Sequence, residues 1–364
     1  MQLDRRAFLA SLAGSAAILA LPDAAAALGA EYFAATRKDD RGTYSAALFR
    51  LDGGDVRVIE LPGRGHDIAL RPGVREWVAF ARRPGRFAIA VPMDERPPVW
   101  FASKPGRHFF GHGVFSADGR LLYTTENDYG LGQGVIGVRD ATDGYEQIGE
   151  LPTYGIGPHD IALLSDRRTL IIANGGLLTH PDSGHEDLNI PDMKPSLAYV
   201  DLETGELLEE HKLAAELHKL SIRHLAVASL DTVVFGCQYQ GPETDFPPLI
   251  GFHRRGEKPA IVAAPDATQS ALLNYIGSVT VDAAGGIAAA SAPKGGVITY
   301  WDVAGRSFLG TCDLTDGCGL APTHHSARFL LTSGEGWLAM GDAEGAMSRQ
   351  SSPFHWDNHA ILVG

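Results

Sequence analysis

Five histidines and a cysteine recur in front of short apolar segments, and their side chains could together hold a metal ion. The pentapeptide that starts at His66, His-Asp-Ile-Ala-Leu, returns letter for letter at His159. Similar segments begin at five other positions, namely His112, His224, Gly277, Cys318 and His359. Imidazole and thiolate groups are common protein ligands of copper, zinc and iron. The candidate metal ligands are therefore His66, His112, His159, His224, His359 and Cys318.

The repeated segments predict a β-propeller. Their starts follow one another at intervals of about 40 to 65 residues, and most are followed by a turn and a second apolar strand. Third strands come next, as at residues 87–91 and 135–139. A unit of four short strands is typical of a propeller blade. Seven starts therefore predict seven blades. The alternative is an irregular β-sandwich, in which the similarity between the repeated segments would be accidental.

The two ends of the chain complement each other in this arrangement. After His359 only residues 360–364 remain, which is enough for one strand. Three strand-like segments without a repeat start lie at the other end, at residues 32–37, 44–51 and 55–61. We therefore expect an all-β fold over residues 30–364, a seven-bladed β-propeller with one-plus-three strand closure of the termini. This closure leaves no open sheet edge in the ring.

A propeller would gather the repeated histidines at the mouth of its central channel, because the first strand of each blade lines the axis. We treat the five histidines as one repeat position and expect them to share a transition metal. Only neutral imidazoles bind metals, so affinity should fall below about pH 6. Two other interpretations remain open. The histidines could be structural clips between blades, with Asp67 and Asp160 fixing their tautomers, or the channel could bind an organic ligand.

Loops that join the second and third strands should open on the same face as the histidines. They include residues 82–85, 238–240 and 333–335, together with the four residues that we expect to contact a cofactor: Glu126, Asn127, Asn174 and Lys294. The two longest insertions, residues 177–196 and 241–248, fall on this face as well. Long loops on one face of a scaffold often carry function.

The first 26 residues resemble an export signal. Arg5 and Arg6 precede an apolar run that reaches Leu21, and Ala24–Ala26 provide a small-residue cleavage site. A short membrane anchor is the alternative, but a run this short and rich in Ala and Gly spans a bilayer poorly. We expect residues 1–26 to be a twin-arginine signal peptide and the mature protein to be periplasmic, with no membrane span.

Composition narrows the classes of partner. The formal net charge is −13, which argues against nucleic acid as a partner. Three cysteines are too few for a disulfide scaffold, although Cys312 and Cys318 could pair in the periplasm. There is no Cys-x-x-Cys-His segment for covalent haem and no Ser nucleophile motif. We expect a monomer, and the sequence does not decide whether it is an enzyme.

The export signal, the seven units and the repeated His-Asp start resemble a bacterial family of twin-arginine-exported seven-bladed β-propellers of unknown function. The residues that carry the resemblance are 66–70, 110–116, 157–160 and 356–359. It covers essentially the whole chain after residue 26. Members of that family are often encoded beside imelysin-type iron-uptake proteins. The resemblance therefore implies the fold, the compartment and a link to metal acquisition, but no reaction.

Three functions compete on these grounds. The first is a periplasmic protein that binds iron or copper at a His-rich channel mouth and serves metal uptake or handling, with imelysin-type proteins as partners. The second is a non-catalytic protein-interaction scaffold whose histidines are structural. The third, a metal-dependent lactonase-type enzyme, normally uses carboxylate and Asn ligands around a hard cation. The His-rich axis argues against the third function.

Overall fold

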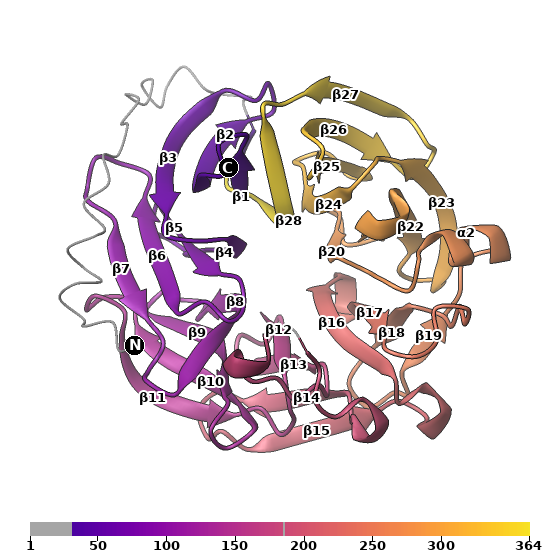
Figure 1. Ribbon diagram of the computed structural model, residues 1–364, viewed down its shortest axis with the longest axis horizontal. Helices are drawn as coiled ribbons and strands as arrows, with labels where there is room; N and C mark the ends of the chain where they lie inside the picture. Colours follow the sequence, from indigo (N-terminus) through magenta and orange to yellow (C-terminus); the bar gives the residue numbers. More distant parts are fainter. Residues whose placement is uncertain (1–30, 185) are drawn as a thin grey trace.

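A computed structural model describes residues 31–184 and 186–364 as a ring of seven four-stranded antiparallel sheets (Figure 1). The seven-bladed all-β propeller predicted from the repeats is confirmed. The predicted signal peptide, residues 1–26, lies outside the described residues. No helix among the described residues has the length and apolar character needed to cross a membrane.

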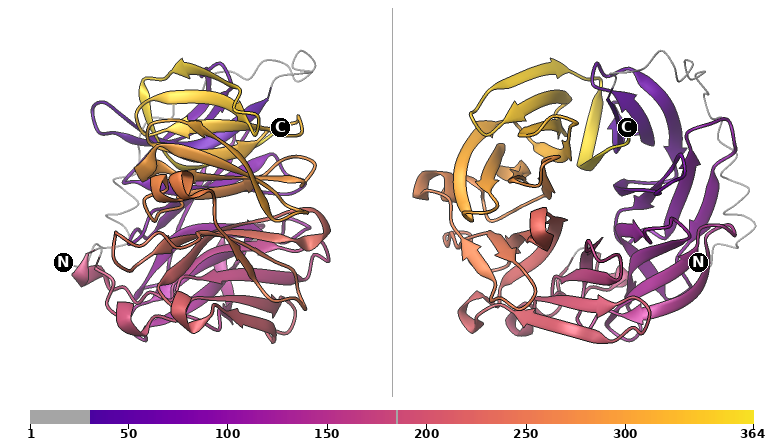
Figure 2. Two further views of the ribbon diagram at one scale, coloured as in Figure 1. Left: turned by 90° about the vertical axis from the view of Figure 1, so that its right-hand side faces the viewer. Right: turned by 180° about the vertical axis from the view of Figure 1, so that it is seen from behind.

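Each blade is a meander whose first strand lies nearest the axis and whose fourth lies at the rim (Figures 1 and 2). Six blades are each formed by one continuous stretch of chain. The first is made of β4 (Gly65–Leu70), β5 (Glu76–Ala81), β6 (Phe87–Pro92) and β7 (Val99–Ala102). The second is made of β8 (Arg107–Phe115), β9 (Leu121–Asp128), β10 (Gln133–Asp140) and β11 (Glu146–Pro152), and the third of β12 (Pro158–Leu163), β13 (Thr169–Asn174), β14 (Ser196–Asp201) and β15 (Leu207–Lys212).

Three more blades follow, made of β16 (Leu220–Val227), β17 (Val233–Tyr239), β18 (Ile250–His253) and β19 (Ala260–Val262); of β20 (Ser278–Val281), β21 (Ile287–Ala292), β22 (Val297–Asp302) and β23 (Ser307–Asp313); and of β24 (Gly317–Pro322), β25 (Arg328–Ser333), β26 (Trp337–Asp342) and β27 (Met347–Ser351). The helix α2 (Asp266–Ala271) and the 3-10 turns Pro181–Ser183, Ile190–Asp192, Ala215–Leu217, Ser229–Asp231 and Pro293–Gly295 lie between strands.

The seventh blade joins the two ends of the chain. Its sheet has the order β28 (Phe354–Leu362), β1 (Tyr32–Asp39), β2 (Tyr44–Arg50) and β3 (Asp55–Leu61). The inner strand β28 pairs antiparallel with β1, for example Ala360 with Ala35. Backbone hydrogen bonds between Tyr32 and the last two residues continue this pairing. The closing sheet therefore depends on main-chain bonds between segments from opposite ends of the sequence.

Apolar side chains from the faces of neighbouring blades form the core. The second and third strands carry unbroken buried runs, such as Glu76–Ala81 and Ser196–Asp201, because both of their faces are covered by adjacent blades. Most outer strands are less buried, and Glu146–Pro152 alternates between exposed and partly buried residues. Burial on both faces fixes the angle between blades and so holds the inner strands around the axis.

Most inner strands contain a β-bulge next to a candidate ligand. In β12 the pairing passes from Pro158–Asn174 to Asp160–Ala173, which leaves His159 without a partner residue. Comparable register shifts occur in β4, β8, β16, β24 and β28. A bulge puts one extra residue into a strand and re-aims the side chains around it. The bulges therefore determine which side chains reach the axis.

Candidate metal centre

The side chains at the axis occupy two successive strand positions. The bulge leaves His159 unpaired in β12 and Arg223 unpaired in β16, while His224 pairs with Gly236 as Asp160 pairs with Ala173. Arg223 thus holds the position of His159, and His224 that of Asp160. The expectation that all five histidines share one repeat position is wrong, because the extra residue of each bulge shifts the register by one.

We call these positions the first and second levels. The first level runs around the ring as Asn358, His66, Gly111, His159, Arg223, Gly277 and Cys318, and the second as His359, Asp67, His112, Asp160, His224, Ser278 and Gly319. Histidine and aspartate therefore alternate along the second level from β28 to β16. The two blades that place no histidine at either level, those of β20 and β24, are neighbours in the ring.

All five predicted histidines converge in one buried group, the His cage: His66, His112, His159, His224 and His359. The ring centroids of His66, His112 and His359 lie 4.7–4.8 Å from one another, and His224 lies 4.7 Å from both His159 and His359. Two triads have ligand nitrogens within 4.8 Å of one another, one of His66, His112 and His359 and one of His112, His159 and His224. His112 belongs to both triads.

His112 is the most strongly perturbed ring of the cage. Its Nδ1 lies 3.0 Å from Asp67 Oδ2 and 3.3 Å from Asp160 Oδ1. Burial opposes a charge on this ring, but the carboxylates of Asp160 and Asp67 outweigh burial and raise its pKa to about 10. The same contacts place the Nδ1 proton toward the carboxylates and leave Nε2 without a hydrogen-bond partner. Carboxylates play this orienting role for metal-binding histidines.

The other four rings favour the neutral form. Burial lowers the pKa of His66, His159 and His224 well below the ordinary value, and neighbouring histidines lower it further. Burial also lowers the pKa of His359 to about 4, against the attraction of Asp67. Neutral imidazole is the form that donates a lone pair to a metal. At neutral pH four rings of the cage are therefore in the metal-binding state.

Each ring of the cage has a nitrogen without a partner among the described residues. These atoms are His66 Nδ1, His112 Nε2, His159 Nε2, both ring nitrogens of His224 and His359 Nε2. The remaining contacts are to side chains, since His159 Nδ1 lies 3.5 Å from Arg223 Nη1 and His359 Nδ1 lies 3.2 Å from Ser278 Oγ. Within residues 31–184 and 186–364 no cage ring bonds a backbone group, as inter-blade clips would require.

Cys318 lies at the first level, but its thiol is turned away from the cage. Its Sγ lies 3.3 Å from the carbonyl oxygens of both Trp356 and Asp357. Burial raises the pKa of this thiol, which keeps it protonated. Cys318 is not among the clustered ligand atoms of the described residues. Cys312 is a free thiol beside the Tyr300 hydroxyl and forms no disulfide with Cys318.

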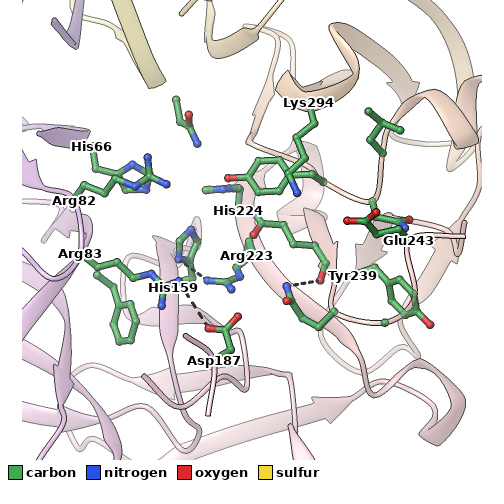
Figure 3. A pocket seen from close by; sticks show the side chains of 18 of the residues that line it. His66, Arg82, Arg83, His159, Asp187, Arg223, His224, Tyr239, Glu243 and Lys294 are labelled. Carbon is green, nitrogen blue, oxygen red and sulfur yellow. Dashed lines mark hydrogen bonds and ion pairs between the residues drawn. The ribbon is translucent and has the colours of Figure 1, made fainter. Parts of the chain in front are cut away.

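A cavity of about 770 Å³ opens over the first level (Figure 3). His66, His159 and His224 line its floor together with Arg223 and Asn358. Its walls come from three of the predicted loops, through Arg82, Arg83, residues 238–240 and Lys294. Both long insertions contribute, the first through Asp187 and the second through residues such as Glu243. Three of the five cage histidines thus face the cavity, whereas His112 and His359 do not line it.

The four predicted cofactor contacts divide between this cavity and the interior. Lys294 lines the cavity, with its ammonium over the Tyr275 ring. Glu126 is buried within β9 and pairs with buried Arg139 of β10 at 2.8 Å. Asn127 bonds His108 and Thr179, and the Asn174 amide donates to the Thr153 carbonyl. These three residues lie in strands, not in the expected loops, and their side chains do not line the cavity.

Comparison with known proteins places the chain in a family. Residues 59–363 match the family described as "Protein of unknown function (DUF1513)". The chain belongs to the DUF1513 family. The match includes all seven inner strands and the whole His cage. No curated protein matches the sequence of this DUF1513 member.

Solved structures resemble this DUF1513 protein in fold. A chain of the Kuenenia stuttgartiensis hydrazine synthase superposes with a TM-score of 0.60, covering 85% of this chain and 89% of its own length. The two sequences are 12% identical. Similarity at this level supports the propeller fold and carries no functional role.

Three residues of the site went unrecognised as site residues in the sequence. Arg223 directly precedes His224. An alignment of the apolar residues that follow each bulge gives Arg223 the same repeat position as His159. Burial lowers the pKa of Arg223 to about 10, and Arg83 adds to this effect. The sequence assigns Asp67 and Asp160 a role only if the histidines are structural clips, whereas both carboxylates contact one ring, that of His112. No repeat pattern indicates that convergence.

Proposed function

We propose that this DUF1513 protein binds one transition-metal ion in the His cage and serves metal uptake or handling in the periplasm. The observation that carries the proposal is the set of buried imidazole nitrogens without partners, one or more on each of five rings. A buried polar atom without a partner is costly, typically about 1–3 kcal/mol. A shared cation would satisfy several of these nitrogens at once.

Charge balance supports the same conclusion. Asp67 and Asp160 both face His112, so two carboxylates lie beside a group of otherwise neutral rings. A divalent cation in the cage would neutralise them. Ligand nitrogens of a tetrahedral site with bonds of about 2.0–2.1 Å lie about 3.3 Å apart. The triads span up to 4.8 Å, so small ring rotations would bring three nitrogens into bonding range.

The ligand set bears on which metal is bound. Imidazole suits iron, copper and zinc, whereas the case for Cu(I) over the others rests on a soft thiolate. Since Cys318 donates to carbonyl groups, the cage supplies nitrogen alone. We propose iron or copper, with iron favoured by the link to imelysin-type iron-uptake proteins that the family resemblance implies. The competing function, an interaction scaffold with structural histidines, would require ring-to-backbone bonds, and the cage rings form none with the described part of the chain.

Metal titration of the mature chain tests the proposal. After treatment with a chelator, the protein should bind Fe(II) or Cu(II) with a stoichiometry of one, as measured by calorimetry and elemental analysis. His112→Ala combined with His224→Ala removes one shared ligand and one further ligand of the second triad, and should lower affinity at least a hundredfold.

The matched control also removes two histidines. His324 and His325 are exposed and lie outside the cage, so His324→Ala with His325→Ala should leave affinity unchanged. Circular dichroism checks that both double variants fold. The proposal fails if the wild-type chain binds none of Fe(II), Cu(I), Cu(II) and Zn(II) stoichiometrically, or if both double variants bind equally well. Cell fractionation checks the compartment.

A further inference from the structure

The cavity above the His cage carries an excess of positive charge in an acidic protein. Arg82, Arg83, Arg223 and Lys294 line it, against the carboxylates of Asp187 and Glu243. The formal net charge of the whole chain is −13, so this cavity differs in the sign of its charge from the protein as a whole. A concave site with an excess of one sign of charge concentrates ligands of the opposite sign.

Arg223 is the central residue of this charge. Only 5% of it is exposed, its Nε has no hydrogen-bond partner, and its Nη1 contacts the neutral ring of His159. Among the described residues no carboxylate lies within ion-pair distance of Arg223 or Arg82; Asp187 lies 3.8 Å from Arg83 and attracts Arg223 only from a longer distance (Figure 3). A buried guanidinium without an anion is unfavourable unless a ligand supplies one.

The shape and lining of the cavity restrict which kind of anion it can bind. Its volume of about 770 Å³ falls within the usual range for small organic ligands, roughly 300–1,000 Å³, and exceeds what an inorganic anion needs. Tyr239, Tyr275 and Phe110 supply apolar surface, while Gln238 and Asn358 supply amides. Guanidinium forks match the planar carboxylate group. These features together suit an organic molecule with several carboxylates.

We infer that the cavity binds an organic polycarboxylate, whose carboxylates pair with Arg223 and Arg82 while one of them faces the His cage. This inference deepens the proposed function, on which it rests for the role of the ligand. His66, His159 and His224 belong to both the cage and the cavity floor. A carboxylate oxygen at that floor could complete the coordination of the ion. The metal would then be handled as an anionic chelate.

Calorimetry with citrate as the probe tests the inference on the mature chain. Citrate should bind the chelator-treated protein with a stoichiometry of one and bind the metal-loaded protein more tightly. Arg223→Gln should weaken citrate binding at least tenfold, and Arg82→Gln should do the same with less disturbance of the buried floor. Arg168→Gln is the matched control, because Arg168 is half-exposed and pairs with Asp201 away from the cavity.

The outcomes separate this inference from the proposed function. If the protein binds metal but no citrate, or if both cavity variants bind citrate as the wild type does, the polycarboxylate site is refuted and the metal site stands. If inorganic phosphate binds as tightly as citrate, the ligand is not an organic polycarboxylate. If citrate binds but no metal does, the arginine site stands and the proposed metal function fails.

Discussion

His112 is the residue at which the two triads and the two carboxylates meet. Because its pKa is raised to about 10, this ring keeps a second proton at neutral pH when no metal is bound. In the unfolded chain the same ring has an ordinary pKa of about 6.5. Its contribution to stability is therefore present below pH 6.5 and is lost as pH rises through 10.

Metal binding should release a proton from His112. Since Nε2 must lose its proton to bind the ion, we expect about one proton released per ion at pH 7.5, and an affinity that rises about tenfold per pH unit between pH 7 and 9. The expected loss of affinity on acidification thus begins well above pH 6. Calorimetry in buffers with different ionisation enthalpies measures the released proton.

The carboxylates supply the control for this prediction. Asp67→Asn with Asp160→Asn removes both charges beside His112 and lets burial lower its pKa. Proton release at pH 7.5 should then disappear, although metal binding should weaken as the ring loses its orienting partners. Equal proton release by the wild type and this variant would contradict the assignment to His112.

At the scale of the strand, the bulges determine which side chains of each inner strand point toward the axis. Gly111 follows Phe110 in the bulge of β8 and has φ = +106°, a conformation that side chains rarely adopt. A Cβ at this position would lie 2.5 Å from Cδ2 of the His66 ring. Gly111 is thus the first-level residue that makes room for a cage ligand from the neighbouring blade.

Gly111→Ala should displace His66 as well as strain the backbone. We expect a loss of roughly 1–3 kcal/mol in the free energy of unfolding and at least a tenfold loss of metal affinity. Gly106→Ala is the matched control, since Gly106 has φ = +82° and open space around its Cβ position. It should cost stability without changing metal affinity. Thermal melts and metal titration distinguish the two, and equal metal affinity in both variants would refute the role of Gly111.

The elements could be predicted far better than the orientation of their side chains. Alternating apolar segments after His66 and His159 suffice to locate strands, because burial between blades demands them. Matching residue types aligns His224 with His159, whereas the apolar residues that follow the bulge align it with Asp160, and the sequence does not say which match the fold uses. Cys318 shows a second limit: it lies at the repeat position of His159, as the sequence predicts, but bonds to local carbonyl groups determine where its thiol points.

At the scale of the whole molecule, ring closure rests on β28. This strand contacts β1 within its own sheet and packs beside the inner strands β4 and β24 of the neighbouring blades. It also carries His359 into the cage. The closing strand therefore contributes both to the architecture and to the candidate metal centre.

Removal of residues 358–364 should open the ring. The deletion exposes the backbone edge of β1, and unpaired edges associate with other chains. We expect a markedly lower melting temperature and oligomers or aggregates in size-exclusion chromatography. His359→Ala is the control, because it removes the ligand and keeps the strand. A truncated chain that stays monomeric with an unchanged melting temperature would show that β28 is dispensable for closure.

The triad of His66, His112 and His359 spans three successive blades and crosses the junction between the two ends of the chain. An ion bound by this triad would cross-link the closing blade to the next two blades and oppose local opening of the ring at that junction. Ligand present at a thousandfold excess over its Kd raises the cost of such opening by about 4 kcal/mol. Amide hydrogen exchange in β28 would then be slower in the metal-bound protein than in the metal-free protein. The exchange rate of β28 would therefore report whether the metal site is occupied.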